Sequence, residues 1–262
     1  MKSIFGTTLD LRAAVAGWPR PAPELIRWAV VCIPVCCIFS KNQSRNNEKI
    51  MDILKYKHII WDWNGTLLDD VRLSVMIINS LLAKRQLPTI SLEYYRKIFA
   101  FPVLHYYDKL GFNFSQESFE SISTEFITTY ERMRSQCDLM SGVPKTLRYI
   151  SQLGLTQSVL SASKQSYLLQ AIVEYGLGET FVEVNGLNNH HASSKVDIGK
   201  NFIARSKLDP SNILLIGDTT HDAEVAASIS AGCCLISNGH QNQKRLATCG
   251  VSVICSLSEL CV

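Results

Sequence analysis

The sequence has no long run of basic residues, and its formal net charge is only +3 over 262 residues. Proteins that bind nucleic acid present a basic face or stripe, so this composition gives no reason to expect a nucleic-acid partner. Small phosphorylated molecules remain possible ligands, because a metal ion and one or two lysines can neutralise a phosphate without a basic surface. Since 47% of the residues are apolar, the chain can bury a sizeable core and a second, smaller module.

The sequence also lacks the cysteine spacing of a zinc site or a redox motif. It has nine cysteines but no Cys-x-x-Cys, and Cys36-Cys37 and Cys233-Cys234 are adjacent pairs. Such an arrangement fits neither a metal site nor a disulfide framework. We therefore predict that the cysteines are small, buried apolar residues in a reducing cytoplasm.

The apolar run over residues 28–39 is too short for a membrane-spanning helix, and Pro34 interrupts it. The run fits the apolar region of a signal peptide, but no Ala-x-Ala-like cleavage site follows it. Met51 stands just before the first predicted strand. We expect residues 1–50 to be a dispensable extension, or to result from a start codon assigned too far upstream, and we expect no membrane partner. A membrane anchor and a secretion signal are the alternatives.

Short β-branched runs alternate with segments of helical spacing along most of the chain. The runs predict strands at 58–61, 157–160, 181–184, 213–216, 234–236 and 252–254, and the helical spacing predicts helices at 70–85, 145–153, 165–175, 198–206 and 222–231. This alternation predicts an α/β fold in which helices cover both faces of a Rossmann-like parallel sheet.

One long stretch departs from this alternation. Residues 72–140 show helical spacing without a clear buried strand, with further helices predicted at 92–101, 103–110 and 118–135. We therefore predict a core formed by residues 51–71 and 141–262, and a helical cap at 72–140 inserted after the first strand.

Acidic residues follow two of the predicted strands. Asp62 follows the strand at 58–61, and Asp218 follows the strand at 213–216, with Asp222 on the first turn of the next helix. Ligand sites of open α/β sheets lie beyond the carboxyl ends of the strands. Because Mg²⁺ favours one or two carboxylates plus water and a substrate phosphate, these acids could hold one such ion.

Residues 59–66, Ile-Ile-Trp-Asp-Trp-Asn-Gly-Thr, and residues 217–222, Gly-Asp-Thr-Thr-His-Asp, resemble the first and fourth motifs of the haloacid dehalogenase-like phosphohydrolases. The chain from about 57 to 258 resembles that family from end to end. The resemblance implies that Asp62 attacks phosphorus and forms an aspartyl-phosphate. It also implies a Mg²⁺ site made by Asp62, the Asn64 carbonyl, Asp218 and, through water or a lysine contact, Asp222.

The same resemblance assigns the phosphate-binding residues. Ser161 matches the family's second motif, a hydroxyl that bonds the transferring phosphoryl group, and Ser163 is a rival two residues away. Lys195 matches the third motif, a lysine that pairs with Asp62 and with the phosphate, and Lys200 is the alternative. Backbone N–H groups at Gly65 and Thr66 can grip phosphate as helix amino ends do. We expect His190 and His191 to be a solvated pair in a loop.

Asn64 departs from the family pattern, in which phosphatases carry a second Asp that protonates the leaving oxygen and later activates water. An Asn keeps the carbonyl ligand but cannot exchange a proton. A proton-donating side chain from the cap could take over the role of the second Asp, and His105, Tyr106 and Tyr107 are candidates. Aromatic residues on a helix are more often part of the core, however, and we expect this of these residues.

The leading hypothesis is a cytoplasmic Mg²⁺-dependent phosphatase of a small phosphorylated metabolite, similar to phosphoglycolate phosphatases. A sugar-phosphate mutase is less consistent with Asn64, because the related mutases depend on the second Asp. The alternative from another class is a protein that has lost catalysis and keeps a phosphate-binding pocket as a sensor or interaction partner. No pattern points to a particular substrate or oligomeric state.

Overall fold

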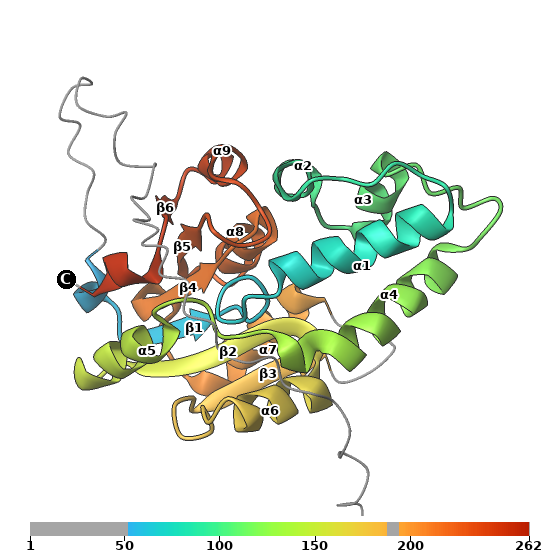
Figure 1. Ribbon diagram of the computed structural model, residues 1–262. Helices are drawn as coiled ribbons and strands as arrows, with labels where there is room; N and C mark the ends of the chain where they lie inside the picture. Colours follow the sequence, from blue (N-terminus) through green and yellow to red (C-terminus); the bar gives the residue numbers. More distant parts are fainter. Residues whose placement is uncertain (1–51, 188–193, 262) are drawn as a thin grey trace, which may run out of the picture. The chain divides into compact units, whose positions relative to one another are not determined.

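The computed structural model describes residues 52–187 and 194–261 (Figure 1). The chain divides into two units, 1–48 and 49–262, and the described residues all belong to the second. Our expectations for residues 1–50 and for His190 and His191 lie outside the described residues. Within the described residues, no helix is long and apolar enough to cross a membrane.

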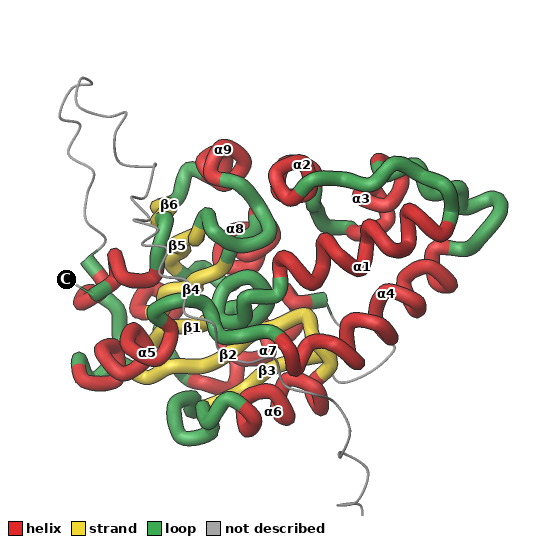
Figure 2. The backbone as a smooth tube through the Cα atoms, in the orientation of Figure 1, coloured by secondary structure: helices red, strands yellow, loops and turns green. Residues whose placement is uncertain are grey.

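In the described part of the chain, six strands form a single sheet in which every neighbouring pair is parallel. Figure 2 shows the strands in yellow and the helices in red. The strands are β1 (His58–Trp61), β2 (Thr156–Lys164), β3 (Glu183–Leu187), β4 (Ile213–Gly217), β5 (Gly232–Ile236) and β6 (Ser252–Ile254), in the spatial order β3-β2-β1-β4-β5-β6. The chain proceeds outward from β1 to β3 on one side and then crosses to β4 on the other. The carboxyl edge between β1 and β4 is therefore the switch point at which such sheets bind ligands.

Two hydrophobic clusters cover the two faces of the sheet. Alternate residues of β1 show the division, since Ile59 and Trp61 belong to one cluster and Ile60 to the other. Helices α5 (Val143–Gln152) and α6 (Gln165–Glu174) contribute to the first cluster, and α7 (Lys195–Ser206) and α8 (Thr220–Ser228) to the second. This arrangement confirms the predicted Rossmann-like α/β fold. A short helix, α9 (Gln243–Leu246), follows β5.

Four helices lie between β1 and α5 in sequence. They are α1 (Val71–Lys84), α2 (Leu92–Ile98), α3 (Val103–Lys109) and α4 (Phe119–Met133). Their apolar residues form a third cluster, in which Tyr106 and Tyr107 are buried as expected of aromatic residues on a helix. Arg85, just after α1, pairs with Glu117 and Glu125, so its guanidinium ties α1 to α4.

Several predicted boundaries differ from the structure. Strand β2 continues to Lys164, and β3 begins at Glu183 rather than at 181. Helix α7 begins at Lys195 rather than at 198, because Ser194 and Asp197 form a capping box at its amino end. The prediction of buried cysteines is wrong for Cys255, which is exposed, whereas Cys234 is buried.

The start of β1 holds a buried histidine. His58 is 1% exposed, its ring stacks on Phe202, and its Nδ1 lies 2.7 Å from the Thr156 hydroxyl, while its Nε2 is buried without a hydrogen-bond partner. Burial lowers the pKa of His58 from 6.5 to about 4, against the opposing charge of Glu183. The folded protein therefore holds this imidazole neutral.

We expect His58 to make the fold sensitive to mild acid. As the pH falls below 6.5 the unfolded chain takes up the proton and the folded protein does not, so stability declines until the pH reaches about 4. The wild-type protein should lose about 1 to 2 kcal/mol more free energy of unfolding between pH 7 and pH 5 than His58→Gln. Urea unfolding at both pH values measures this difference. His105→Gln, at an exposed position, should keep the wild-type loss, and an equal loss in His58→Gln would contradict the prediction.

Candidate active site

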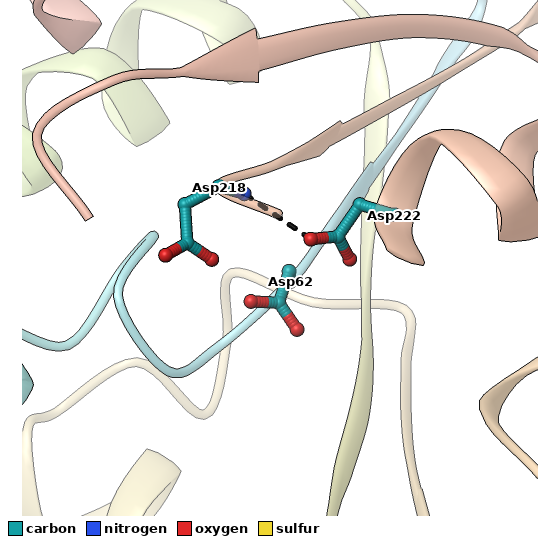
Figure 3. A group of neighbouring side chains, drawn as sticks. All are labelled: Asp62, Asp218 and Asp222. Atoms are coloured by element: carbon teal, nitrogen blue, oxygen red, sulfur yellow. Dashed lines mark hydrogen bonds between the residues drawn. The ribbon is translucent and has the colours of Figure 1, made fainter. Parts of the chain in front are cut away.

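Three carboxylates converge at the carboxyl edge of the sheet (Figure 3). Asp62 directly follows β1, Asp218 directly follows β4, and Asp222 lies on the first turn of α8. The two strands are paired in register, with Trp61 opposite Ile216, and this pairing brings Asp62 and Asp218 together. Ligand oxygens of the three acids lie within 4.8 Å of one another, and all three side chains are buried.

Lys195 joins this cluster from the first residue of α7. Its buried ammonium donates to Asp62 and, at 2.5 Å, to Asp222. The other candidate, Lys200, is exposed further along the same helix. The structure therefore places Lys195, and not Lys200, against the acids.

Burial dominates the electrostatics of the cluster. It raises the pKa of Asp62 to about 6 and the pKa of Asp218 well above its usual value, and the neighbouring carboxylates add to both shifts. Although burial acts in the same direction on Asp222, Lys195 and Thr219 hold the pKa of that carboxyl below its usual value. When all three carboxylates are ionised, they and the ammonium carry a net charge of −2, and a divalent oxygen-seeking cation would neutralise this charge and favour the ionised form. The donor set therefore fits Mg²⁺.

The loop after β1 passes close to Asp218. Gly65 has a φ of +72°, and a Cβ at this position would overlap the Asp218 carboxylate and the His240 ring. The Thr66 hydroxyl lies 3.3 Å from both Asp62 and Asp218. The Gly65 N–H donates to Asp70, so a phosphate contact at this group stays a prediction that requires the bond to open.

Asn64 lies in a hydrogen-bonded network that uses both ends of its amide. Its Nδ2 donates to Asp70 at 2.8 Å and to the Tyr130 hydroxyl at 2.6 Å, and its Oδ1 accepts from Ser163 at 2.7 Å. Tyr130 in turn donates to Asp70. Ser163 is thus bound to Asn64, while Ser161 is buried within β2 and its hydroxyl oxygen accepts from the Ser163 N–H.

Asp70 and His240 are site residues that the sequence did not reveal. Asp70 precedes α1, but its carboxylate makes no capping bond and accepts from Asn64, Gly65 and Tyr130. Burial raises the pKa of Asp70, but the charge of His240 and hydrogen bonds from His240, Tyr130 and Asn64 hold it below its usual value. The His240 Nε2 lies 3.2 Å from Asp70.

His240 also touches the metal cluster and the helical insertion. Its backbone N–H donates to Asp218, and its Nδ1 lies 2.8 Å from the Tyr95 hydroxyl on α2. Burial opposes the imidazolium form, but Asp70 raises the pKa of His240 to about 9. One signal could have pointed here: Gly239 follows β5 at the same sheet edge, and a Cβ there would overlap Asp218.

These residues open into one cavity of about 450 Å³. Its lining includes the three acids, Lys195, Asn64 and Ser161, together with residues of α2, α3 and α4. Tyr106 and Tyr107 line it from α3, whereas His105 is exposed and is not among the lining residues.

Comparison with known proteins places the chain among hydrolases. Residues 59–236 match the family model of the haloacid dehalogenase-like hydrolases. A phosphoglycolate phosphatase from Pseudomonas syringae pv. tomato is 23% identical over 199 residues, which cover 73% of each chain. An N-acetylmuramic acid 6-phosphate phosphatase from Pseudomonas aeruginosa is 25% identical over 181 residues, covering 66% of this chain and 78% of that protein.

Solved structures share the fold at low identity. A haloacid dehalogenase-like family protein from Streptococcus pneumoniae superposes with a TM-score of 0.69 at 16% identity, over 79% of this chain and 97% of that chain. A predicted phosphoglycolate phosphatase from Haemophilus somnus superposes with a TM-score of 0.64 at 18% identity, with the same coverage.

We expect the cluster to bind one Mg²⁺ per chain, and Asp218→Asn to weaken that binding at least about tenfold, because a neutral amide replaces a charged ligand. Isothermal titration of the wild-type protein and the variant measures the change. Asp108→Asn removes an acid from an exposed position outside the cluster and should leave the affinity unchanged. Equal affinities for wild type and Asp218→Asn would remove Asp218 from the metal site.

Proposed function

The chain belongs to the haloacid dehalogenase-like hydrolases, and on that premise we propose that it is a Mg²⁺-dependent phosphatase of a small phosphorylated metabolite. The observation that carries the proposal is the buried contact of the Asp62 carboxylate with Lys195, beside Asp218 and Asp222. A nucleophile, a cation and a metal-binding pair of acids are the groups that phosphoryl transfer to a carboxylate requires. Curated relatives named as phosphatases support the same reaction class.

Asp62, Asp218 and the Asn64 carbonyl would hold the ion directly, and Asp222 would act through water or through its contact with Lys195. When bound, the ion supplies positive charge against the phosphoryl oxygens. The Lys195 ammonium adds a second positive charge and orients Asp62 through its hydrogen bond. Ser161 would donate its hydroxyl to a phosphoryl oxygen.

The reaction proceeds in two displacements. An Asp62 oxygen attacks phosphorus, the bond from phosphorus to the alcohol oxygen breaks, and that oxygen takes a proton from water. Water then attacks the aspartyl-phosphate at phosphorus, releases inorganic phosphate and regenerates the Asp62 carboxylate. Splitting one difficult displacement into two easier ones is the advantage of the covalent route.

We propose that residues 72–140 act as the cap over this site, since residues of their helices line the same cavity as the acids. Closure of such a cap excludes water and selects the substrate. A cytoplasmic location stays a prediction from the cysteine pattern. The mutase hypothesis is not supported further, because Asn64 offers no proton and its amide is committed to Asp70, Tyr130 and Ser163.

The second candidate function is a phosphate-binding protein without turnover, and the Asn64 network is the observation that favours it. An Asp at position 64 would place its carboxylate against that of Asp70, so the surroundings of this residue suit an amide. If the natural protein is catalytically impaired, the impairment is built into the packing around Asn64 and is not the result of one substitution.

We expect Asp62→Asn to abolish turnover, lowering kcat for p-nitrophenyl phosphate with Mg²⁺ by at least about a thousandfold, because the amide cannot form the covalent intermediate. Release of p-nitrophenolate measures the rate, and Asp108→Asn serves as the matched control. Full activity in Asp62→Asn would refute the nucleophile assignment.

We expect Asn64→Asp to bring no gain in turnover and to lower the free energy of unfolding by about 1 to 3 kcal/mol, because two carboxylates then face each other. The double variant Asn64→Asp, Asp70→Asn exchanges amide and carboxylate and should recover most of that stability. Urea unfolding and p-nitrophenyl phosphate turnover measure both effects. A large gain in turnover for Asn64→Asp would instead identify the natural protein as catalytically impaired.

A further inference from the structure

The part of the cavity lining that comes from the helical insertion, which we call the insertion wall, is mostly aromatic and aliphatic. Residues from α2, α3, α4 and their connections form it, among them Tyr95, Phe99, Phe101, Tyr106, Phe126 and Ile127. Phe99 packs edge-on against Phe101 and Tyr106, with ring centroids 5.5 and 5.3 Å apart. The part of a substrate that extends away from the phosphate would meet this wall.

Positive charge is scarce in the whole described lining of the cavity. Among the described residues that line the cavity, Lys195 is the only lysine or arginine, and its ammonium already contacts Asp62 and Asp222. The His240 ring is held by Asp70, and the His221 Nδ1 lies 3.0 Å from Glu224. A carboxylate on the substrate would therefore lose its hydration without gaining a free cationic partner, which is unfavourable.

Two hydroxyls on the insertion wall lack partners. The oxygens of Tyr106 and Ser123 are buried without a hydrogen bond, and both residues line the cavity. Each can bond one neutral oxygen of a ligand. These two buried hydroxyls by themselves would not satisfy the several hydroxyls of a sugar.

The cavity also has room for more than a phosphate and a small acid. Its volume is about 450 Å³, whereas a cavity of about 150 Å³ is enough to hold a benzene ring. A ring-sized alcohol, its phosphate and an ion therefore fit together.

We propose that the alcohol part of the substrate is uncharged, largely apolar and ring-sized, carrying at most one or two neutral oxygens. This inference rests on the proposed phosphatase function and narrows it. It excludes phosphoglycolate, whose two-carbon acid would leave the insertion wall uncovered and its carboxylate unpaired, although several relatives are named for that substrate. It also excludes sugar phosphates.

Three esters of primary alcohols test the inference on the full chain with Mg²⁺. They are 2-phenylethyl phosphate, phosphoglycolate and glucose 6-phosphate, whose leaving groups have similar intrinsic reactivity. We expect kcat/KM for 2-phenylethyl phosphate to exceed the other two values at least about tenfold, as differences in apolar contact allow. Equal or reversed values that are still abolished by Asp62→Asn would overturn the inference and leave the phosphatase function standing.

A substitution on the insertion wall gives a second test. Ile127 lines the cavity from α4 and is 53% exposed, so a longer polar side chain can be placed there without filling the core. We expect Ile127→Arg to raise kcat/KM for phosphoglycolate about tenfold over Ile127→Gln and to lower that for 2-phenylethyl phosphate. No difference between the two variants with either ester would contradict the inference.

Binding separates a failure of the inference from a failure of the function. The inert analogues 3-phenylpropylphosphonate and 3-phosphonopropionate replace the ester oxygens of the aromatic and the glycolate ester with methylene groups. If no ester is hydrolysed, the phosphatase function fails. Tighter binding of 3-phenylpropylphosphonate by isothermal titration would then still support the inference, and equal, weaker or undetectable binding would overturn it.

Discussion

The ammonium of Lys195 is the constraint on which the site depends, because it is the charge that lets Asp62 and Asp222 approach each other inside the protein. Burying an ionised carboxylate without a partner costs several kcal/mol, and a third acid, Asp218, lies in the same cluster. The capping box at Ser194 fixes where α7 begins and so where Lys195 points. A short stretch of sequence thereby determines whether the three acids can lie together.

Asn64 departs from the family pattern, and the side chains around it form hydrogen bonds that suit its amide. Its amide donates to Asp70 and Tyr130 and accepts from Ser163, so the residue is bound on both sides. Tyr130 comes from the helical insertion, while Ser163 belongs to β2. The helical insertion, the proposed cap, therefore also positions the loop that follows Asp62.

The sequence predicted those parts of the site that depend on local pattern. A short apolar strand before Asp62 and another before Asp218 are visible in sequence, and parallel pairing then brings their ends together. Lys195 was predicted by motif, although the start of its helix was not. Asp70, Tyr130 and His240 could not be identified as a group, because the bonds between them span 60 and 170 residues and depend on how the insertion packs.

His240 connects the acidic cluster with the helical insertion. Its backbone N–H donates to Asp218, and its Nδ1 lies 2.8 Å from the hydroxyl of Tyr95, which lines the cavity. If Asp218 holds the ion as proposed, a bound alcohol that shifts this ring would also shift a ligand of the ion. Thermodynamic linkage is reciprocal, so the ion must change the affinity for that alcohol by the same factor. The selectivity of the protein among substrates would then depend on which divalent cation is bound, and its selectivity among cations would depend on the substrate.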